Sequence, residues 1–315
     1  MIVTLTVNPA IDRNVTVDRL VFEDRAYILS TRESAGGRGV NASCVIHAFG
    51  GQTLAIVSAG GKSGARIRSL MRSDCRFPMR VVRIRNEIRT NLTVTDKAGL
   101  TVKLNELGPR MDKVELARLE KVVVQSLAGA SWIMICGSLP PGVPHEFYSR
   151  MVAAARNARV RVLLDADGEE LRQGIEAGPT VVTPNHQEAE RLLNKALITR
   201  THFLDGADRI RRMGAESVIL SLGSRGVVAA RNNFMLEVIP PRIDAVCPIG
   251  AGDAMAAAFV WAMDREDNFT DAVRWAVAAG TASARLPGVT FASLEQTREL
   301  YGLVEIRPVS ESLSL

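Results

Sequence analysis

The sequence predicts an α/β fold in which a mostly parallel β-sheet is covered by helices on both faces and carries a small β subdomain. Apolar segments of strand length alternate with helix-like segments over most of the chain, which is the pattern of βαβ units. The strand segments are nearly continuous in apolar residues, as expected for strands buried on both faces. Ligands of such folds bind at the carboxyl ends of the strands, so polar motifs that follow strands are the candidate site.

The first half of the chain contains strand segments of two kinds. IVTLTV at 2–7 and TLAIVSA at 53–59 are runs of apolar and β-branched residues and predict buried strands. Between them, 15–34 is mixed and is expected to form short strands, and 36–50 begins with glycines and becomes helical. Further strands are predicted for MRVVRIR (79–85), RTNLTVTD (89–96) and GLTVKLN (99–105), with a turn between the last two.

From Asp112 onwards helices and strands alternate. The predicted helices are 112–127, 144–157, 186–193, 204–214 and those from Gly252 to the end; the predicted strands are 130–137, 161–166, 180–185 and 217–223, with a hairpin over 226–240. This order places four strand-end motifs along one rim of the sheet: GSLPPG (137–142), DADG (165–168), TPN (183–185) and SLGSRG (221–226).

The composition limits the class of protein. The 315 residues carry a net charge of +5 without long basic runs, and 5% are aromatic, which suits anionic small molecules at least as well as nucleic acid. No apolar run approaches the length of a membrane span, and the N-terminus lacks the pattern of a signal peptide. The four cysteines show no CxxC spacing, so a reduced, cytoplasmic protein is expected. No linker or repeat divides the chain, which predicts one domain over 1–315.

Two glycine-rich stretches do not fit known phosphate motifs. Gly61-Lys62-Ser63 ends like a P-loop, but Ile56 stands where that motif needs its first glycine. GRGVNA at 37–42 fits the loose dinucleotide pattern, yet no clear strand runs directly into it and no acid ends a second strand about twenty residues on. A P-loop NTPase and a nicotinamide enzyme are therefore disfavoured.

GAGD at 250–253 leaves two interpretations open. Asp253 at the start of a helix is a common cap, since an acid there stabilises the helix dipole. Small residues before a helix also make an anion site from backbone N–H groups, and a carboxylate beside that site would then belong to the chemistry.

Seven motifs together resemble the PfkB (ribokinase-like) carbohydrate kinase family. They are NPAID (8–12), GGRGVN (36–41), RTN (89–91), GSLPPG (137–142), TPNHQE (183–188), SLGSRG (221–226) and GAGD (250–253). NPAID, GSLPPG and GAGDAM are most similar to the branch of 1-phosphofructokinase and tagatose-6-phosphate kinase. The resemblance implies a three-layer α/β/α core, a discontinuous β-sheet lid from about 13–34 and 80–105, the use of ATP and Mg²⁺, and a homodimer formed through the lid.

The resemblance implies the following roles. Asp253 would be the general base, and the N–H groups of Gly250, Ala251, Gly252 and Asp253 would form an anion hole. Asp12, Asn41 and the backbone of Gly36 and Gly37 would bind the sugar, and Arg38, Arg89 and Ser138 its phosphate. Glu188 would hold Mg²⁺ with support from Asp165. Asn185, Ser221, Gly223 and Gly226 would contact the nucleotide.

Three positions depart from the family pattern. The family usually has lysine at Arg38, lysine at Thr183 and threonine at Pro248. Thr183 and Pro248 place nucleotide use in question. Thr183 removes a cation, and Pro248 fixes φ and removes an N–H.

The expected function is ATP-dependent conversion of fructose 1-phosphate to fructose 1,6-bisphosphate. The alternatives are a tagatose-6-phosphate or 6-phosphofructo kinase, a kinase of neutral sugars or nucleosides, and a non-catalytic sugar-phosphate-binding regulator.

Overall fold

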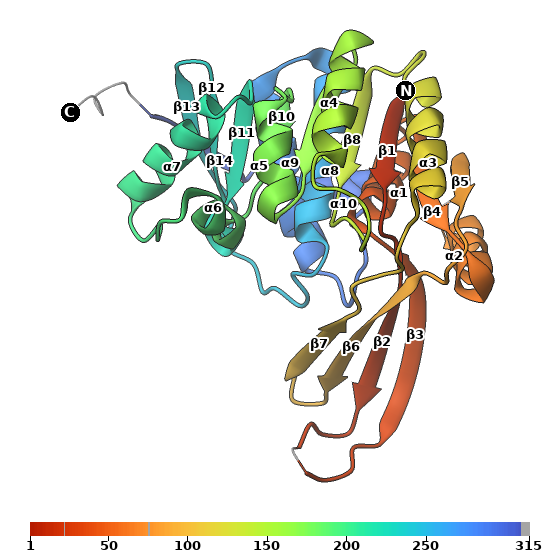
Figure 1. Cartoon of the computed structure of the whole chain (residues 1–315). Coiled ribbons are helices and arrows are strands. Elements are labelled where there is room, and N and C mark those ends of the chain that lie inside the picture. Colours follow the sequence, from red (N-terminus) through yellow and green to blue (C-terminus); the bar gives the residue numbers. More distant parts are fainter. Residues whose placement is uncertain (22, 75, 310–315) are drawn as a thin grey trace.

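The computed structural model describes residues 1–21, 23–74 and 76–309. A ten-stranded sheet lies at the centre of the molecule (Figure 1). Neighbouring strands from β11 to β5 pair in parallel, and β12, β13 and β14 pair antiparallel. In spatial order the strands are β14 (Glu305–Val309), β13 (Phe234–Ile239), β12 (Val227–Arg231), β11 (Ser217–Ser221), β10 (Val181–Val182), β9 (Arg161–Asp165), β8 (Trp132–Cys136), β1 (Ile2–Thr6), β4 (Thr53–Ala59) and β5 (Met79–Arg83).

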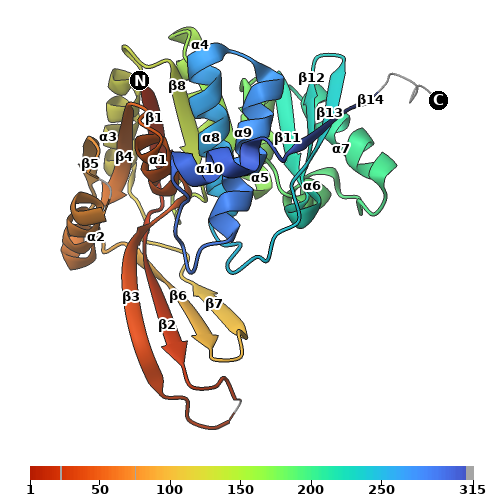
Figure 2. The same ribbon diagram turned by 180° about the vertical axis from the view of Figure 1, so that it is seen from behind.

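Helices cover both faces of this sheet (Figures 1 and 2). One face carries α2 (Gly61–Asp74), α3 (Lys113–Ser126), α4 (Phe147–Asn157), α5 (Gly168–Glu176), α6 (His186–Leu193) and α7 (Arg200–Arg212). The opposite face carries α1 (Arg38–Ala48), α8 (Ala251–Glu266), α9 (Phe269–Ala284) and α10 (Leu294–Tyr301). The predicted α/β fold with a covered, mostly parallel sheet is confirmed.

Strand periodicity divides the hydrophobic core into two layers. Ile133 and Ile135 of β8 belong to the cluster under α3 and α4, whereas Trp132 and Met134 belong to the cluster under α8 and α9. Successive side chains of a strand point to opposite faces, so a strand covered on both faces must be apolar throughout. This is why the buried strands are recognisable in the sequence.

A separate four-stranded sheet projects from one end of the body and forms the lid (Figure 1). Its order is β3 (Ile28–Gly36), β2 (Ala10–Val17), β6 (Arg89–Asp96) and β7 (Thr101–Asn105). Its polar side chains alternate with apolar ones, unlike those of the central strands, because its two faces have different surroundings.

The lid differs in extent from the segments expected for it. The expected segment 80–105 included β5, but β5 pairs with β4 in the central sheet. Polar and apolar residues alternate along β5 as they do along the lid strands, because β5 is an edge strand whose Arg80 and Arg83 are exposed. The lid strands also extend to Ala10 and Gly36, beyond the expected 13–34.

The remaining differences concern short elements. The strand predicted over 180–185 has only two residues, and the C-terminal region ends in the strand β14 rather than in helices alone. The helix α5 was not predicted; it begins after Asp167, whose side chain caps the N–H of Gly168. The helix α2 begins at Gly61, so GKSG forms its first turn after the strand β4.

The cysteines only partly match the sequence prediction. Cys136 and Cys247 are free, whereas Cys44 is disulfide-bonded, contrary to the expected reduced state. Spacing along the chain does not reveal which thiols the fold brings together. Cys75 lies outside the described residues.

No helix in the described ranges is long and apolar enough to cross a membrane.

Candidate active site

The four strand-end motifs lie on one rim of the central sheet, as predicted. β8 and β9 are parallel neighbours, and the N–H of Gly137 donates to the carbonyl of Asp165 at 2.8 Å. Asn185 forms a parallel bridge with Ser221, whose N–H donates to the carbonyl of Pro184 at 3.0 Å. The motifs after β8, β9, β10 and β11 are therefore contiguous in space.

The start of α8 is a glycine turn. Gly250 has φ +83° and ψ −7°, values of the third position of a type II turn, which favours glycine. The turn closes through the Ala251 N–H, which donates to the carbonyl of Pro248 at 3.2 Å. Pro248 thus contributes its carbonyl oxygen as the acceptor of the turn hydrogen bond, which requires no N–H from this residue.

The turn engages one of the four N–H groups that were expected to form an anion hole, that of Ala251. Because the N–H of Ala251 is engaged with Pro248, the N–H groups of Gly250, Gly252 and Asp253 are the donors that the first turn of a helix leaves without intrahelical partners. Among the described residues, a Cβ placed on Gly252 would meet no atom within 4 Å. This end of α8 therefore offers backbone donors and room for an anion.

Asp253 lies in this first turn and is held by α1. The Asn41 side chain donates from Nδ2 to Asp253 Oδ2 at 2.7 Å. Burial raises the pKa of Asp253 to about 7, the Asp165 carboxylate adds to the increase, and Arg38 and Asn41 oppose it. A carboxylate with this pKa and a fixed orientation has the properties of a general base near neutral pH.

Asp12 lies at the base of the lid and accepts a hydrogen bond from Asn91 Nδ2 at 2.8 Å. Burial raises its pKa, and the hydrogen bond from Asn91 opposes the increase. Gly36 pairs with Ala10 beside it, and a Cβ on Gly36 would lie 2.3 Å from the Asp12 carboxyl carbon. Gly36 must therefore be glycine for Asp12 to keep this position, and Gly37, at φ +120°, leads from the lid into α1.

Arg89 is anchored at the hinge between lid and body. Its Nη1 donates to the Glu106 carbonyl at 3.1 Å and its Nη2 to the Asn8 carbonyl at 3.0 Å. Its Nε is buried and has no hydrogen-bond partner in the described part of the chain. Arg89 and residues 105–109 also line a cavity of about 530 Å³. The guanidinium is thus pre-positioned, and its Nε donor remains unused.

Asn8 connects this hinge to Ser138, and sequence reasoning did not single it out. Its Nδ2 donates to the Leu107 carbonyl at 2.9 Å and approaches Ser138 Oγ at 3.3 Å. The asparagine is buried, at 3% exposure, and within the described residues its Oδ1 is unpartnered. Its place in the NPAID motif was the available signal, and Asn91 in RTN was missed in the same way.

Arg38 forms ion pairs with two acids, and a Cβ on Gly137, the residue before Ser138, would lie 4.0 Å from Arg38 Cγ. Its Nη1 lies 2.7 Å from Asp165 Oδ1 and its Nη2 lies 3.0 Å from Glu188 Oε1. The same two carboxylates were predicted to support a metal ion. The structure thus groups Arg38 with the acids of the rim.

Glu188 and Asn185 form a capping box at the start of α6. Asn185 Oδ1 accepts from the Glu188 N–H, and Glu188 Oε2 accepts from the Asn185 N–H at 2.9 Å. Glu188 Oε1 remains for another partner and accepts from Arg38. Burial raises the pKa of Glu188, and Arg38 opposes the increase.

The acids fit Mg²⁺ only together with other ligands. Within the described ranges, no three His, Cys, Asp or Glu side chains group in a way that could hold a metal ion. Mg²⁺ keeps several waters and commonly uses one or two carboxylates plus substrate phosphates. Asp165 and Glu188 match that donor set.

The loop after β11 combines an open glycine and a packed one. Gly223 has φ +62°, is exposed, and faces open space in the described structure, whereas a Cβ on Gly226 would lie 2.1 Å from the Val238 carbonyl. Gly226 is therefore required by packing, and Gly223 remains accessible.

Thr183 is buried, and its Oγ1 lacks a hydrogen-bond partner among the residues described.

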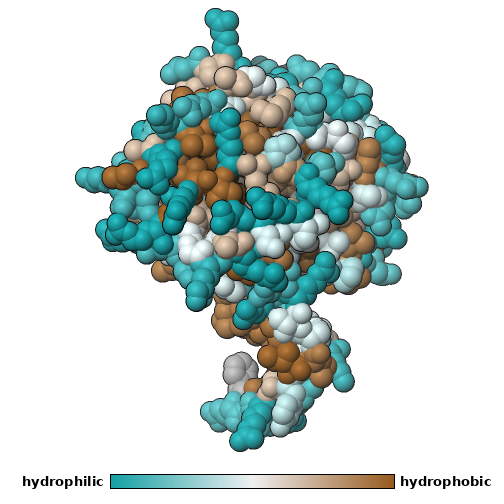
Figure 3. Space-filling view, turned by 90° about the vertical axis from the view of Figure 1, so that its right-hand side faces the viewer, coloured by the Kyte–Doolittle hydropathy of each residue, from teal (hydrophilic) through white to brown (hydrophobic). Residues whose placement is uncertain are grey.

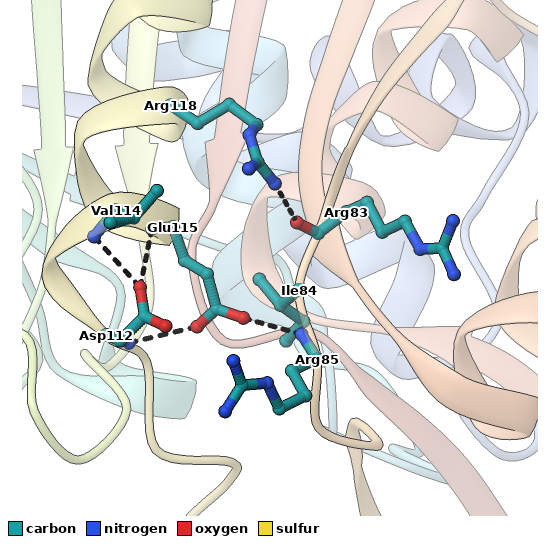
Figure 4. A pocket seen from close by; sticks show the side chains of 7 residues that line it. All are labelled: Arg83, Ile84, Arg85, Asp112, Val114, Glu115 and Arg118. Atoms are coloured by element: carbon teal, nitrogen blue, oxygen red, sulfur yellow. Dashed lines mark hydrogen bonds between the residues drawn. The ribbon is translucent and has the colours of Figure 1, made fainter.

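A second cavity lies away from this rim. It has a volume of about 310 Å³ and is lined by Arg83, Ile84, Arg85, Asp112, Val114, Glu115 and Arg118 (Figure 4). Its carboxylates are engaged locally, since Asp112 caps α3 and Glu115 accepts from the Arg85 N–H at 2.6 Å. None of the predicted site residues lines it.

Comparisons with known proteins agree with the geometry. The pfkB family of carbohydrate kinases matches residues 4–297. The ATP-dependent 6-phosphofructokinase isozyme 2 of Escherichia coli strain K12 is 30% identical over 95% of this chain and 97% of its own length. The 1-phosphofructokinase of Borreliella burgdorferi is 29% identical over 90% of this chain and 92% of its own.

Solved structures show the same fold. A crystal structure of phosphofructokinase-2 from Escherichia coli in complex with potassium superposes with a TM-score of 0.89 at 28% identity, covering 96% of this chain and 98% of that one. An Arabidopsis thaliana ribokinase, complexed with ribose and ATP, reaches a TM-score of 0.76 at 19% identity over 95% and 98% of the two chains. The fold is therefore ribokinase-like.

Proposed function

The chain belongs to the pfkB family of carbohydrate kinases, and from this premise we propose that it uses ATP to phosphorylate a ketohexose phosphate, converting fructose 1-phosphate to fructose 1,6-bisphosphate. The observation that carries the proposal is Asp253, held by Asn41 at the start of α8 with a pKa of about 7. A base and an anion site at the same helix end are what transfer of a phosphoryl group to a hydroxyl requires.

In the proposed reaction Asp253 accepts the proton of the attacking sugar hydroxyl. The hydroxyl oxygen forms the new bond to the γ-phosphorus of ATP, and ADP leaves with the electron pair of the broken bond. The N–H groups of Gly252 and Asp253 stabilise charge on the transferred phosphoryl group. Asn41 keeps the base oriented, and with its amide hydrogen bond it favours the ionised form.

The sugar phosphate binds between lid and body in this proposal. Asp12 accepts hydrogen bonds from sugar hydroxyls and is oriented by Asn91. Arg89 and Ser138 bind the phosphate, with the buried Nε of Arg89 as an available donor. These two groups favour a phosphorylated substrate over a neutral sugar or nucleoside.

The nucleotide is assigned to the rim beside β10 and β11. Asn185, Ser221, Gly223 and Gly226 lie in the two loops that meet there, and Gly223 provides exposed backbone. Asp165 and Glu188 would hold Mg²⁺, which supplies charge neutralisation on the phosphates when bound. Thr183 brings no cation to this region.

The two phosphofructokinase activities differ in which hydroxyl of fructose is attacked, and the relatives named for each are nearly equally similar. A panel of fructose 1-phosphate, fructose 6-phosphate, tagatose 6-phosphate, fructose, ribose and a nucleoside, each with ATP and Mg²⁺, decides between them when read by ADP release. We expect the highest kcat/KM with fructose 1-phosphate. Preference for fructose 6-phosphate or tagatose 6-phosphate would select the corresponding alternative kinase, and absence of ADP release throughout would support a sugar-phosphate-binding regulator.

The pKa of Asp253 predicts the pH dependence of the reaction. Because the base acts in its ionised form, kcat/KM should fall about tenfold for each pH unit below 7. Asn41→Ala removes a hydrogen bond to the ionised carboxylate and should move the midpoint to higher pH. The measurement is kcat/KM from pH 5.5 to 9; a flat profile between pH 5.5 and 7.5 would contradict the role of Asp253.

The lid has an apolar face suited to a second copy of the chain. Leu92 pairs with Leu104, and Val94 pairs with Val102, so these side chains share one face, whereas Asp12 and Asn91 lie on the other. Leu104 is 57% exposed, and Figure 3 shows apolar surface on the projecting lid. Exposed apolar side chains on a sheet favour association, so we propose a homodimer through this face.

Leu104→Asp is expected to convert the dimer to a monomer, because it places a charge in the apolar interface. Lys103→Asp is the matched control, since the neighbouring residue of the same strand points to the opposite face. Mass measured by sedimentation at micromolar concentration decides the outcome. A Leu104→Asp variant that stays dimeric would exclude this face as the interface.

A further inference from the structure

The position of Arg38 has a consequence for metal binding that rests on the proposed kinase function and goes beyond it. Arg38 is the first residue of α1, and its two terminal nitrogens contact carboxylates from two other elements, Asp165 at the end of β9 and Glu188 in α6. The contacts of 2.7 and 3.0 Å are charge-assisted hydrogen bonds, which are stronger than neutral ones.

These acids need a cation. The side chains of Asp165 and Glu188 are only 10% and 3% exposed. Buried carboxylates without a counter-charge are strongly disfavoured. Among the ion pairs of the described residues, Arg38 is the cation that meets both Asp165 and Glu188.

A divalent cation and a guanidinium compete for the same oxygens. Carboxylate oxygens are the ligands of Mg²⁺, and Glu188 Oε2 is already used by the helix cap, which leaves Oε1 for either cation. Arginine does not deprotonate in proteins, so it can yield its place only by moving. Its side chain is 36% exposed, which leaves room for such a movement.

We propose that Arg38 is an internal counter-ion that occupies the metal acids Asp165 and Glu188 and is exchanged for the divalent cation when the metal binds. Metal binding then releases a guanidinium beside the phosphate-binding rim. Arg38 is accordingly a positioning residue for the two acids, and its charge sets the affinity of the pair for metal.

The test is Mn²⁺ affinity measured by electron paramagnetic resonance without sugar or nucleotide. Arg38→Met should bind Mn²⁺ about tenfold more tightly than the unmodified protein, since the competing cation is absent. Arg191→Met is the matched control, because Arg191 pairs with the exposed Asp167 on the same rim at 2.7 Å and does not contact either metal acid; its affinity should change less than twofold. Unchanged or weaker binding by Arg38→Met, or equal tightening in both variants, would overturn the proposal.

A second measurement uses the unmodified protein and does not depend on the folding of a variant. The side-chain ¹⁵N signal of Arg38, assigned by its loss in Arg38→Lys, should shift when Mg²⁺ is added, while the signals of peripheral arginines stay constant. An Arg38 signal unmoved at saturating Mg²⁺ would exclude the exchange. Neither measurement contains substrates, so failure of the substrate panel and failure of this proposal are separate results.

Discussion

Asp253→Asn is expected to lower kcat by about 10³-fold, within the range that general acid–base catalysis contributes. The amide has nearly the same shape as the carboxylate but cannot accept the proton of the attacking hydroxyl. Its oxygen can still accept the hydrogen bond from Asn41 Nδ2, so the start of α8 should keep its structure. The rate is measured as ADP release at saturating sugar phosphate and ATP.

The control for this variant is nucleotide affinity. ATP binding, measured by calorimetry, should change less than about threefold, because the backbone donors of the helix end remain. A kcat within tenfold of the unmodified protein would show that Asp253 is not the base. A large loss of ATP affinity with a lowered melting temperature would instead indicate structural damage.

Arg89→Ala is expected to raise the KM for the sugar phosphate by about 10- to 150-fold, since a hydrogen bond to a charged group contributes about 1.5–3 kcal/mol. The KM for the unphosphorylated sugar should change little, because that substrate has no phosphate to lose. The ratio of the two KM values is the decisive quantity, since Arg89 also anchors the hinge through the carbonyls of Asn8 and Glu106.

The matched control for Arg89 is Arg13→Ala. Arg13 lies on the neighbouring lid strand, where it pairs with Glu33 on the lid face opposite Asp12, and its removal should leave both KM values unchanged. An equal increase of KM for phosphorylated and neutral sugars in Arg89→Ala would mean that Arg89 acts only through the hinge. The assignment of a phosphorylated substrate would then lose its main support.

The long buried elements could be predicted because their pattern follows directly from their surroundings. The strands β4 and β8 are apolar on both faces, and the capping residue Asn185 precedes a helix whose bounds match the prediction. β5 was assigned to the lid because an edge strand is half exposed wherever it lies, and pairing partners are not visible in one segment.

The motifs predicted where the candidate site residues lie, but they predicted less well which residues contact one another. Asp253, Asp12 and Glu188 lie where the motif order places them, on the rim or at the base of the lid. Asn8 and Asn91 were missed, since an amide that orients another residue acquires its role only when that residue is near. The N–H of Ala251, expected to be an anion donor, instead closes a turn, because that hydrogen bond depends on the backbone angles of Gly250.

The sequence by itself determined the α/β class and the rim of the sheet on which the strand-end motifs lie, because periodicity and strand-end motifs are local properties of the chain. Only the tertiary structure decided the partners of Arg38. Asp165 and Glu188 lie 127 and 150 residues from it, and ion pairing depends on distances in space that no local pattern encodes. For the same reason, only the structure shows that the carbonyl of Pro248 is the acceptor in the turn that begins α8.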